Sequence, residues 1–368
     1  MSSKVRRIAV LLQSLEAGGA QRRVVDLANG FIGEGREVDL FLVDPSGKLR
    51  DRVAPQIRLF PAVELGPRLQ SDPPGVLLSG ASAVHARAVR SLPAQRSFPL
   101  VLRASSHPQR RFPWSMPRQR FGEFARRPSR MNAYAAADLI IAVADAVAEP
   151  LREAFPAKPI EVIRNQVITD EFLAGATAHI DYPWPDDSSV PLIVGIGRLA
   201  VAKDFPTLFR AFALVRRSRQ LRLAILGGGP DTQRQRLVRL AEKLGIASDV
   251  ALVDHSDEVA AWLSRAKLLV SSSLWEGAPA VLVEALAMGC PAIATDSPGA
   301  AREILADREL GGLVPPRRPR LMADAIAEWL DRPVDQQRLW AATEPYRRDP
   351  AQDYLRAIDA CAERFAPA

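Results

Sequence analysis

The chain has 368 residues, enough for two or three domains, and its 48% hydrophobic and 25% charged residues exclude a disordered, collagen-like or coiled-coil chain. Forty-nine Lys and Arg against 42 Asp and Glu give a net charge of +7, which suits anionic small molecules, acidic membrane surfaces or nucleic acid. Two cysteines are too few for a disulfide framework or a cysteine metal site, and no uncharged apolar run is long enough to span a membrane. We therefore expect a cytoplasmic protein.

Short apolar runs alternate with helix-length amphipathic segments in the first half, which is typical of a parallel sheet covered by helices. Seven strands are predicted, at residues 8–14, 38–43, 56–60, 76–78, 99–103, 139–143 and 160–163. Helices are predicted at 19–33, 82–91, 117–137 and 145–155. Residues 181–190, rich in Pro, Asp and Ser, predict a domain linker.

A second unit of the same kind follows the expected linker. Its strands are predicted at 192–196, 221–226, 250–253, 268–271, 292–295 and 312–314. Its helices are predicted at 205–217, 232–244, 258–264, 279–288, 300–305 and 319–330. A last amphipathic helix, 350–365, is expected to dock back on either domain, the N-terminal one in our assignment. The predicted domains are therefore 1–185, 186–345 and the helical tail 346–368.

Ligands of such sheets bind beyond the carboxyl ends of the strands. Strand 192–196 contains Gly195 and runs directly into Gly197, so the chain can turn tightly there. Arg198 and Lys203 follow, and two cations beside such a turn predict a phosphate site. Solvated surface charge is the alternative. Gly195-x-Gly197-x-x-Ala200 also fits a dinucleotide fingerprint, but the next strand ends in glycines instead of the acidic residue that holds a ribose. An NAD-dependent oxidoreductase is therefore disfavoured.

Two further strand ends carry candidate residues. Gly227, Gly228 and Gly229 follow strand 221–226 and would let the backbone approach a nucleotide or sugar, although a plain turn would also use glycine. His255 follows strand 250–253, where backbone groups could hold a base; a turn residue is the alternative.

The richest strand end carries two glutamates. Glu276 follows strand 268–271, Gly277 and Pro279 shape the turn, and Glu284 lies about two helical turns later among apolar residues. A carboxylate there needs hydrogen-bond donors, which ribose hydroxyls would supply, and Glu276 suits the hydroxyl pairs of a sugar. The helix start between them offers N–H groups to a diphosphate. Two unrelated surface glutamates are the alternative.

The first half offers two weaker candidates. Gly18 and Gly19 open a long helix after the first strand, and His107 follows strand 99–103. A lone histidine in a loop is often structural. His107 is a candidate because it lies at the carboxyl end of a strand.

These motifs resemble the retaining family 4 glycosyltransferases of GT-B fold. The resemblance is strongest over residues 195–316, where GIGRL with Lys203, ILGGGP, EGAPAVLVEALAMGCPAIATDSPG and GGLVPP occur in the family's order. GGAQR and VIRNQV are weaker supports. The resemblance implies an α/β protein with two Rossmann-like parallel-sheet domains facing across a cleft, an N-terminal acceptor domain and a C-terminal domain for a nucleotide-diphosphate sugar.

The resemblance also implies roles for single residues. Arg198 and Lys203 would neutralise the leaving diphosphate, Glu276 would bind the donor sugar and Glu284 the ribose. His107 would lie near the transferring sugar, although its SSHPQRR context departs from the family's commonest pattern. The other positions implied to bind the donor are Gly18, Gly19, Gly197, Gly227, Gly229, His255, Gly277, Ala278, Pro279, Ala280, Val281 and Leu282. No Asp-x-Asp triplet occurs, so neither a metal ion nor a cofactor is expected.

The expected function is transfer of a sugar, with retention, from a UDP- or GDP-sugar to a glycan or lipid-linked acceptor in cell-surface polysaccharide, lipopolysaccharide or glycolipid biosynthesis. A nucleotide-sugar epimerase or hydrolase and a catalytically silent binding protein are the alternatives. Residues 103–130 carry eight arginines, one acidic residue and four large aromatic side chains. This segment predicts peripheral contact with anionic lipid on the inner face of a membrane; a solvated basic helix face is the alternative, and nucleic acid is not expected.

Overall fold

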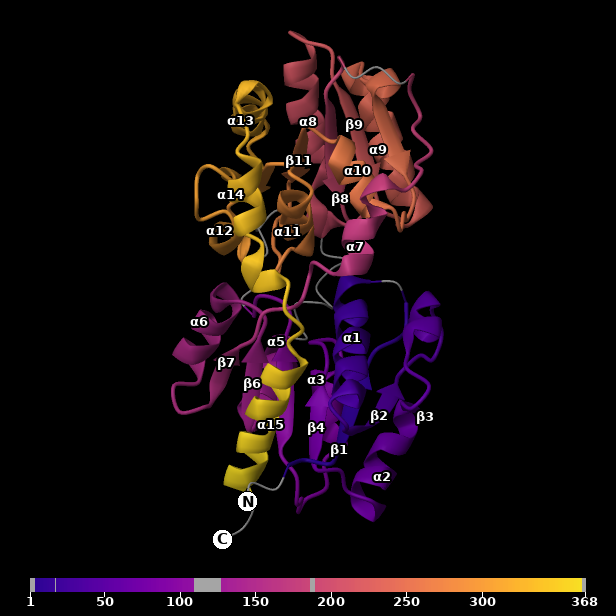
Figure 1. Ribbon diagram of the computed structural model, residues 1–368, viewed down its shortest axis with the longest axis vertical. Helices are drawn as coiled ribbons and strands as arrows, with labels where there is room; N and C mark the ends of the chain where they lie inside the picture. Colours follow the sequence, from indigo (N-terminus) through magenta and orange to yellow (C-terminus); the bar gives the residue numbers. More distant parts are fainter. Residues whose placement is uncertain (1–3, 17, 109–126, 186–188, 366–368) are drawn as a thin grey trace. The chain divides into compact units, whose positions relative to one another are not determined.

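The computed structural model of the protein describes residues 4–16, 18–108, 127–185 and 189–365 (Figure 1). The chain forms two compact units. Unit 1 comprises Met1–Gln166 and Asp349–Ala368, and unit 2 comprises Val167–Arg348. The chain therefore passes from one unit to the other twice, between residues 166 and 167 and between 348 and 349.

Unit 1 is built on a seven-stranded sheet in the order β3-β2-β1-β4-β5-β6-β7, in which every neighbouring pair is parallel. The strands are β1 (Arg7–Leu12), β2 (Glu37–Leu42), β3 (Arg58–Pro61), β4 (Val76–Ser79), β5 (Leu100–Ala104), β6 (Leu139–Ala142) and β7 (Ile160–Val162). The predicted strands of this half are confirmed. They were readable because a parallel strand buried on both faces is a continuous apolar run, as in β1 and β4.

Helices cover this sheet. They are α1 (Gly19–Gly33), α2 (Leu65–Ser71), α3 (His85–Arg90), α5 (Arg127–Ala136), α6 (Asp145–Ala154) and α15 (Ala351–Phe365). The prediction of a helix at 117–137 is confirmed for α5, and its residues 117–126 lie outside the described part of the chain. The sequence pattern missed α2, because seven residues are too few to show a helical period.

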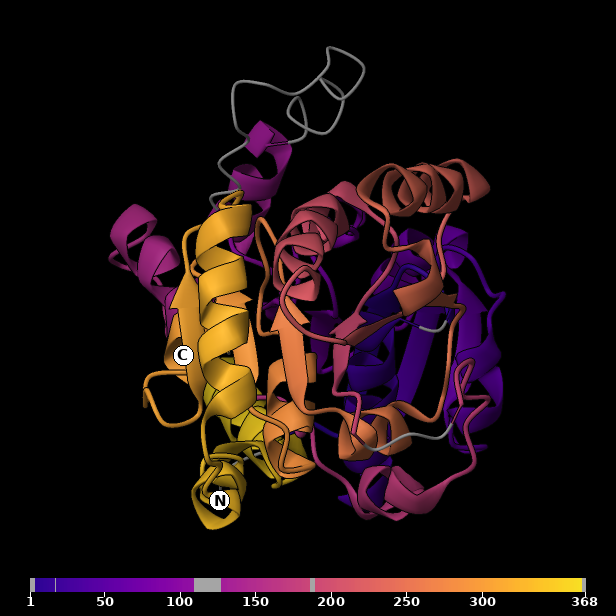
Figure 2. The same ribbon diagram turned by 90° about the horizontal axis from the view of Figure 1, so that it is seen from above.

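Unit 2 repeats the architecture with six parallel strands in the order β10-β9-β8-β11-β12-β13. The strands are β8 (Leu192–Ile196), β9 (Arg222–Leu226), β10 (Val250–Val253), β11 (Leu268–Ser271), β12 (Ala292–Thr295) and β13 (Gly311–Val314). The helices are α7 (Asp170–Ala174), α8 (Phe205–Arg216), α9 (Asp231–Leu244), α10 (Val259–Arg265), α11 (Ala280–Ala287), α12 (Ala301–Ile304), α13 (Pro319–Asp331) and α14 (Gln336–Ala341). Figure 2 shows α8 and α13 side by side; with α9 and the strands they enclose one hydrophobic core. Among the described residues, no helix has the length and hydropathy that crossing a membrane requires.

The segment expected to link the domains belongs to unit 2. The rings of Tyr182 and Trp184 lie 5.5 Å apart, and the Arg222 guanidinium lies 5.7 Å from each ring. Arg222 also donates a hydrogen bond of 2.9 Å to the Pro185 carbonyl, which ties this segment to the start of β9. The division of the chain therefore falls at residue 166 instead of 185, because two aromatic side chains anchor residues that composition alone marks as a linker.

The C-terminal helix α15 packs in unit 1, among the indigo and purple elements of Figure 1. Arg36 donates a hydrogen bond of 2.7 Å to Asp359, and the Val5 N–H donates one of 2.9 Å to the same carboxylate. At Gly30 of α1 a Cβ would lie only 2.7 Å from the Cβ of Ala351, so glycine permits the close contact of the two helices.

We expect Gly30→Ala to lower the free energy of unfolding by about 1–3 kcal/mol, because the added methyl forces α1 and α15 apart. Gly33→Ala on the same helix is the matched control, since a Cβ there meets nothing within 4 Å. Because alanine has a higher helix propensity than glycine, Gly33→Ala should leave the free energy of unfolding unchanged or raise it by up to about 1 kcal/mol. Urea titrations followed by circular dichroism measure both, and equal stability of the two variants would contradict this packing of α15 on α1.

Candidate functional site

Lys203 and Glu276, two of the predicted site residues, follow the neighbouring strands of unit 2 at which the strand order of its sheet reverses. Strands β8 and β11 are neighbours, but the chain continues from β8 to β9 on one side and from β11 to β12 on the other. The loops that follow β8 and β11 therefore diverge and leave room between them at the carboxyl edge, the usual ligand position in a doubly wound sheet.

An ion pair joins these two loops. Lys203 Nζ, after β8, lies 2.5 Å from Glu276 Oε1, after β11, and both side chains are about one-fifth exposed (19% and 18%). Partial burial reduces the screening of the pair by water, while both groups stay accessible to a ligand. The structure thus brings together two residues that the sequence places 73 positions apart.

Serines hold the pair in position. The Ser273 hydroxyl donates a hydrogen bond of 2.7 Å to Glu276 Oε1, and the Ser272 hydroxyl donates one of 2.7 Å to the Lys203 carbonyl. The Leu274 N–H donates to the Ala202 carbonyl at 2.7 Å, which joins the loops through the backbone as well. Sequence reasoning missed both serines, although a polar run directly after a buried strand was the available signal.

A third loop, between β12 and α12, supports Glu276 from its backbone. The Glu276 N–H donates to the Pro298 carbonyl at 2.9 Å, and the Ala300 N–H donates to the Gly277 carbonyl at 2.8 Å. Gly299 has a φ of 133°, and a Cβ there would lie 2.7 Å from the Glu276 carbonyl oxygen, so only glycine allows this approach. The Glu276 side chain is therefore presented from a well-braced turn.

Two of the predicted ligand glycines have a packing function. Gly227, with a φ of 143°, would place a Cβ 2.3 Å from the Gly197 carbonyl oxygen, and a Cβ on Gly229 would lie 2.6 Å from the Leu199 Cβ. The loop after β9 thus presses against the loop after β8. Contact between the two loops explains these glycines without a ligand, and their role towards a donor stays a prediction. Gly197, with a φ of 146°, makes room for the Lys203 side chain, whose Cε would lie 2.5 Å from a Cβ.

Asp204 is a further charged group at this edge. It begins α8 with a left-handed backbone (φ 42°, ψ 42°), and its carboxylate accepts a hydrogen bond of 2.7 Å from the Thr207 hydroxyl. Burial raises the pKa of Asp204, while the Thr207 hydrogen bond and the charges of Arg317 and Arg210 oppose that rise. Asp204 adjoins Lys203 in the sequence, so its ionisation affects the potential at the site.

Helix α11 places the remaining donor candidates of unit 2. Pro279 caps it, the half-buried Glu284 is its fifth residue, and Leu282 is fully buried. The Leu282 N–H already donates to the Pro279 carbonyl at 3.1 Å, so within this turn Ala280 and Val281 are better placed to offer N–H groups to a ligand.

The remaining predicted residues come from several parts of the fold. Arg198 is exposed after β8, and His255 is exposed with its Nε2 3.4 Å from Asp257. Gly18 caps α1 in unit 1, next to Gly19, and His107 is half-buried after β5. Ala278 is half-buried beside Gly277.

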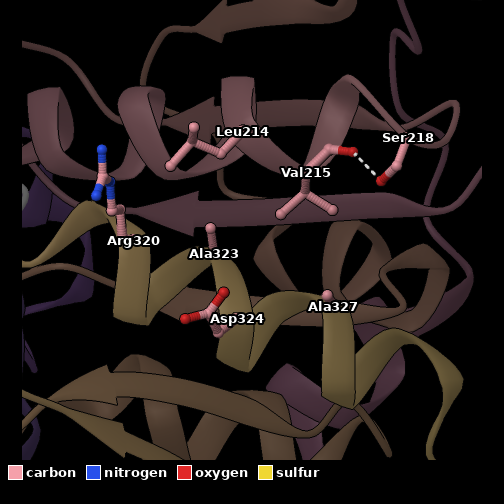
Figure 3. A pocket seen from close by; sticks show the side chains of 7 residues that line it. All are labelled: Leu214, Val215, Ser218, Arg320, Ala323, Asp324 and Ala327. Carbon is pink, nitrogen blue, oxygen red and sulfur yellow. Dashed lines mark hydrogen bonds between the residues drawn. The ribbon is translucent and has the colours of Figure 1, made fainter.

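A pocket of about 360 Å³ lies away from these residues, between α8 and α13 (Figure 3). Its wall is largely aliphatic, and its charged groups, Arg320 and Asp324, are exposed on α13. The lining residues are Leu214, Val215, Ser218, Arg320, Ala323, Asp324 and Ala327. None of them is a predicted site residue, so this pocket is not the candidate site.

The cysteines carry no nucleophilic chemistry. Burial raises the pKa of the Cys290 thiol to about 12 and that of the Cys361 thiol to about 11. Both therefore remain protonated at neutral pH.

Comparison with known proteins follows the same two halves. Residues 17–171 match the family described as Glycosyltransferase Family 4, and residues 190–332 match Glycosyl transferases group 1. The chain belongs to this glycosyltransferase family. The resemblance inferred from its motifs is confirmed.

One relative is the N-acetylgalactosamine-N,N'-diacetylbacillosaminyl-diphospho-undecaprenol 4-alpha-N-acetylgalactosaminyltransferase of Campylobacter jejuni, 30% identical over 183 residues. The match covers 49% of this chain and 47% of the relative, so the chain spans about half the length of the curated relatives it matches.

Solved structures establish the GT-B fold of this glycosyltransferase family member. The sucrose-phosphate synthase of Thermosynechococcus elongatus superposes with a TM-score of 0.71 at 19% identity, over 98% of this chain and 97% of that one. Anabaena HepE, solved in complex with UDP-glucose, superposes with a TM-score of 0.67 at 17% identity, over 98% of both chains. The predicted fold class is confirmed.

Asp204 yields a pH-dependent prediction. Because its pKa is raised in the folded state, its ionised form destabilises the fold above that pKa, and the destabilisation vanishes as the carboxyl becomes protonated in acid. Asp204→Asn removes the charge, keeps an oxygen for Thr207 and tolerates the left-handed backbone. We expect its Tm to exceed that of the unmodified chain by roughly 1–3 °C at pH 7.5, with the difference shrinking towards pH 4.

Differential scanning calorimetry at both pH values measures this effect. Asp231→Asn, at an exposed residue in the first turn of α9, is the control and should not raise the Tm, because it removes a favourable charge from a helix start. A gain for Asp204→Asn that is equal at both pH values would show that ionisation is not its cause.

Proposed function

We propose that this chain transfers a sugar from a nucleoside-diphosphate donor to a glycan or lipid-linked acceptor, with retention at the anomeric carbon. The observation that carries the proposal is the Lys203–Glu276 pair at the point where the strand order of unit 2 reverses. Membership of the glycosyltransferase family supplies the class of reaction.

In this proposal, the donor diphosphate shares Lys203 with Glu276. A phosphate oxygen competes with Oε1 for the ammonium group, and the carboxylate then turns its oxygens to the hydroxyls of the donor sugar. Ser273 supports this exchange, because its hydroxyl keeps a hydrogen bond on Glu276 while Lys203 moves towards the phosphate. Arg198, exposed on the same loop, adds a guanidinium that can bind two phosphate oxygens.

The proposed reaction breaks the bond between the anomeric carbon and the diphosphate oxygen. The sugar passes through an oxocarbenium-like state, the acceptor oxygen bonds to the same face, and the acceptor's proton leaves with the diphosphate. Cations held in place before the reaction stabilise the charge that develops on the leaving group. The absence of an Asp-x-Asp triplet is our reason for assigning that task to Arg198 and Lys203 rather than to a metal ion.

Within this proposal, Glu284 binds the ribose, and the start of α11 contacts phosphate through the Ala280 and Val281 N–H groups. Gly277, Ala278 and Pro279 shape that turn. In unit 1, His107 acts on the transferring sugar, and Gly18 and Gly19 approach the donor or acceptor at the start of α1.

The names of similar proteins support the proposed acceptor and donor classes. The Campylobacter jejuni relative is named for a diphospho-undecaprenol substrate, and HepE was solved with UDP-glucose. A lipid-linked acceptor would bring this chain to a membrane surface in cell-surface polysaccharide synthesis. Segment 103–130 stays our prediction for that contact, and its residues 109–126 lie outside the described part of the chain.

A panel of radiolabelled UDP- and GDP-sugars, incubated with native membrane extract, tests the function. We expect label to pass from one donor into a lipid-extractable or polymeric product. Lys203→Met should lower kcat/KM by about 100-fold or more, and Glu276→Gln by about 10- to 100-fold, because each removes a charged contact to the donor.

Arg219→Gln is the matched control, since Arg219 pairs with Asp331 away from the site, and it should keep the rate of the unmodified chain. Full activity in Lys203→Met and Glu276→Gln would refute the site. Release of free labelled sugar without acceptor would favour the hydrolase alternative, and NMR of the product's anomeric proton tests retention.

A further inference from the structure

Arg103 is a buried cation in unit 1 that donates hydrogen bonds to uncharged groups. It lies in β5 and is 2% exposed. Its Nη1 donates a hydrogen bond of 3.1 Å to the Gly80 carbonyl, and its Nη2 donates one of 2.7 Å to Asn165 Oδ1. Within the described parts of the chain, no acidic side chain forms an ion pair with it. A buried charge with neutral partners costs free energy that an apolar residue of similar size would not.

A third neighbour of Arg103 comes from the other end of the chain. The Tyr354 hydroxyl in α15 is buried and lies close enough to the Arg103 guanidinium to interact with it. Burial raises the pKa of Tyr354, and the Arg103 charge opposes that rise.

The positions of these neighbours along the chain are significant. Asn165 stands two residues before Val167, where the chain first enters unit 2, and Tyr354 follows the return to unit 1 at Asp349. Arg103 therefore contacts the unit 1 side of both crossings between the units.

The unit 2 side of the crossings is braced separately. The Val167 and Ile168 N–H groups both donate to the Tyr346 carbonyl, at 2.7 and 3.0 Å. Arg347 continues this bracing, because its N–H donates to the Glu344 carbonyl at 3.2 Å and its Nε donates to the Thr343 hydroxyl at 3.0 Å. The first residues of unit 2 are thus tied to the chain just before the second crossing.

Arg103 also connects this region to the candidate residues of unit 1. His107 follows four residues after Arg103 on the same segment, and Ser106 Oγ lies 3.3 Å from Ser82 Oγ, two residues beyond Gly80. The guanidinium therefore joins the ends of β4 and β5, which lead into these loops, to both crossings.

We propose that Arg103 is a positioning residue that anchors the unit 1 side of both crossings to the carboxyl edge of the unit 1 sheet and so keeps His107, four residues along the same segment, in place. This role rests on the proposed transferase function and adds no contact to substrate. The role needs a guanidinium, because a single group must donate hydrogen bonds to both Gly80 and Asn165 while it lies beside Tyr354.

Arg103→Met tests the proposal, since an unbranched apolar side chain of similar length can occupy the site. We expect the Tm of Arg103→Met to stay within a few degrees of that of the unmodified chain. Its Kd for UDP or GDP, measured by calorimetry, should stay within about twofold of the unmodified value, because the proposed diphosphate contacts lie in unit 2. The kcat should fall about tenfold or more. Arg103→Lys should recover little, because an ammonium cannot span both acceptors.

Arg96→Met is the matched control. Arg96 donates to Asp138 at 2.8 Å and lies 4.6 Å from the Phe365 ring of α15, so it joins the same helix to the unit far from the crossings. Its loss should lower the Tm and leave kcat unchanged. A fall in kcat for Arg103→Met no larger than that for Arg96→Met would overturn the proposal.

Hydrogen exchange separates this proposal from the transferase assignment. Amides in residues 163–168 and 349–356 should exchange faster in Arg103→Met than in Arg96→Met, whether or not a donor is turned over. Unchanged exchange there would overturn the anchor even in an active transferase. An unmodified chain that binds neither UDP nor GDP would refute the proposed function while leaving the exchange comparison intact.

Discussion

The candidate site depends on one ion pair, Lys203 with Glu276. The two residues stand on loops that lead to opposite sides of the sheet, and the pair joins the loops together with a backbone hydrogen bond from Leu274 to Ala202. The pair is partly buried, which preserves its attraction better than at an open surface. In the proposed function, the pair provides a cation for the phosphate groups and an anion for the hydroxyl groups of a diphosphate sugar. A ligand of that chemistry can enter by sharing the two charges instead of meeting an unpaired one.

The loops around the pair are rigid for reasons that are independent of any ligand. Hydrogen bonds from Ser272 and Ser273 fasten the loop after β11 to the loop after β8. The absent side chains of Gly227 and Gly299 let neighbouring backbone segments approach closely behind them. Glycine at these strand ends therefore allows the loops to pack closely, and the donor-binding role of Gly227 and Gly229 stays a prediction.

In unit 1, the main structural requirement is to hold the two crossings and the C-terminal helix α15. The sheet of this unit must host two chain crossings and a C-terminal helix that arrives from the other unit. The Arg36–Asp359 pair and the close contact at Gly30 attach the helix, and Arg103 occupies the point where the helix, the first crossing and the strand ends meet. A guanidinium is suited to that junction because its several N–H groups point in different directions within one plane.

The sequence by itself determined the strands, most of the longer helices and the family. Parallel strands buried on both faces leave uninterrupted apolar runs, and the length of α1 shows a full helical period, so local pattern suffices for both. It also named Lys203 and Glu276 as candidates, because they are charged residues that follow buried strands, at the edge where parallel sheets bind ligands.

Only the tertiary structure decided that Lys203 and Glu276 meet, that Ser273 supports them, that residues 181–185 belong to unit 2 and that α15 packs on α1. Each of these depends on contacts between residues far apart in the chain: 73 positions for the ion pair and 37 from Arg222 to Pro185. Such contacts arise from the order of strands in a sheet and the packing of whole elements, which no local pattern of residues encodes.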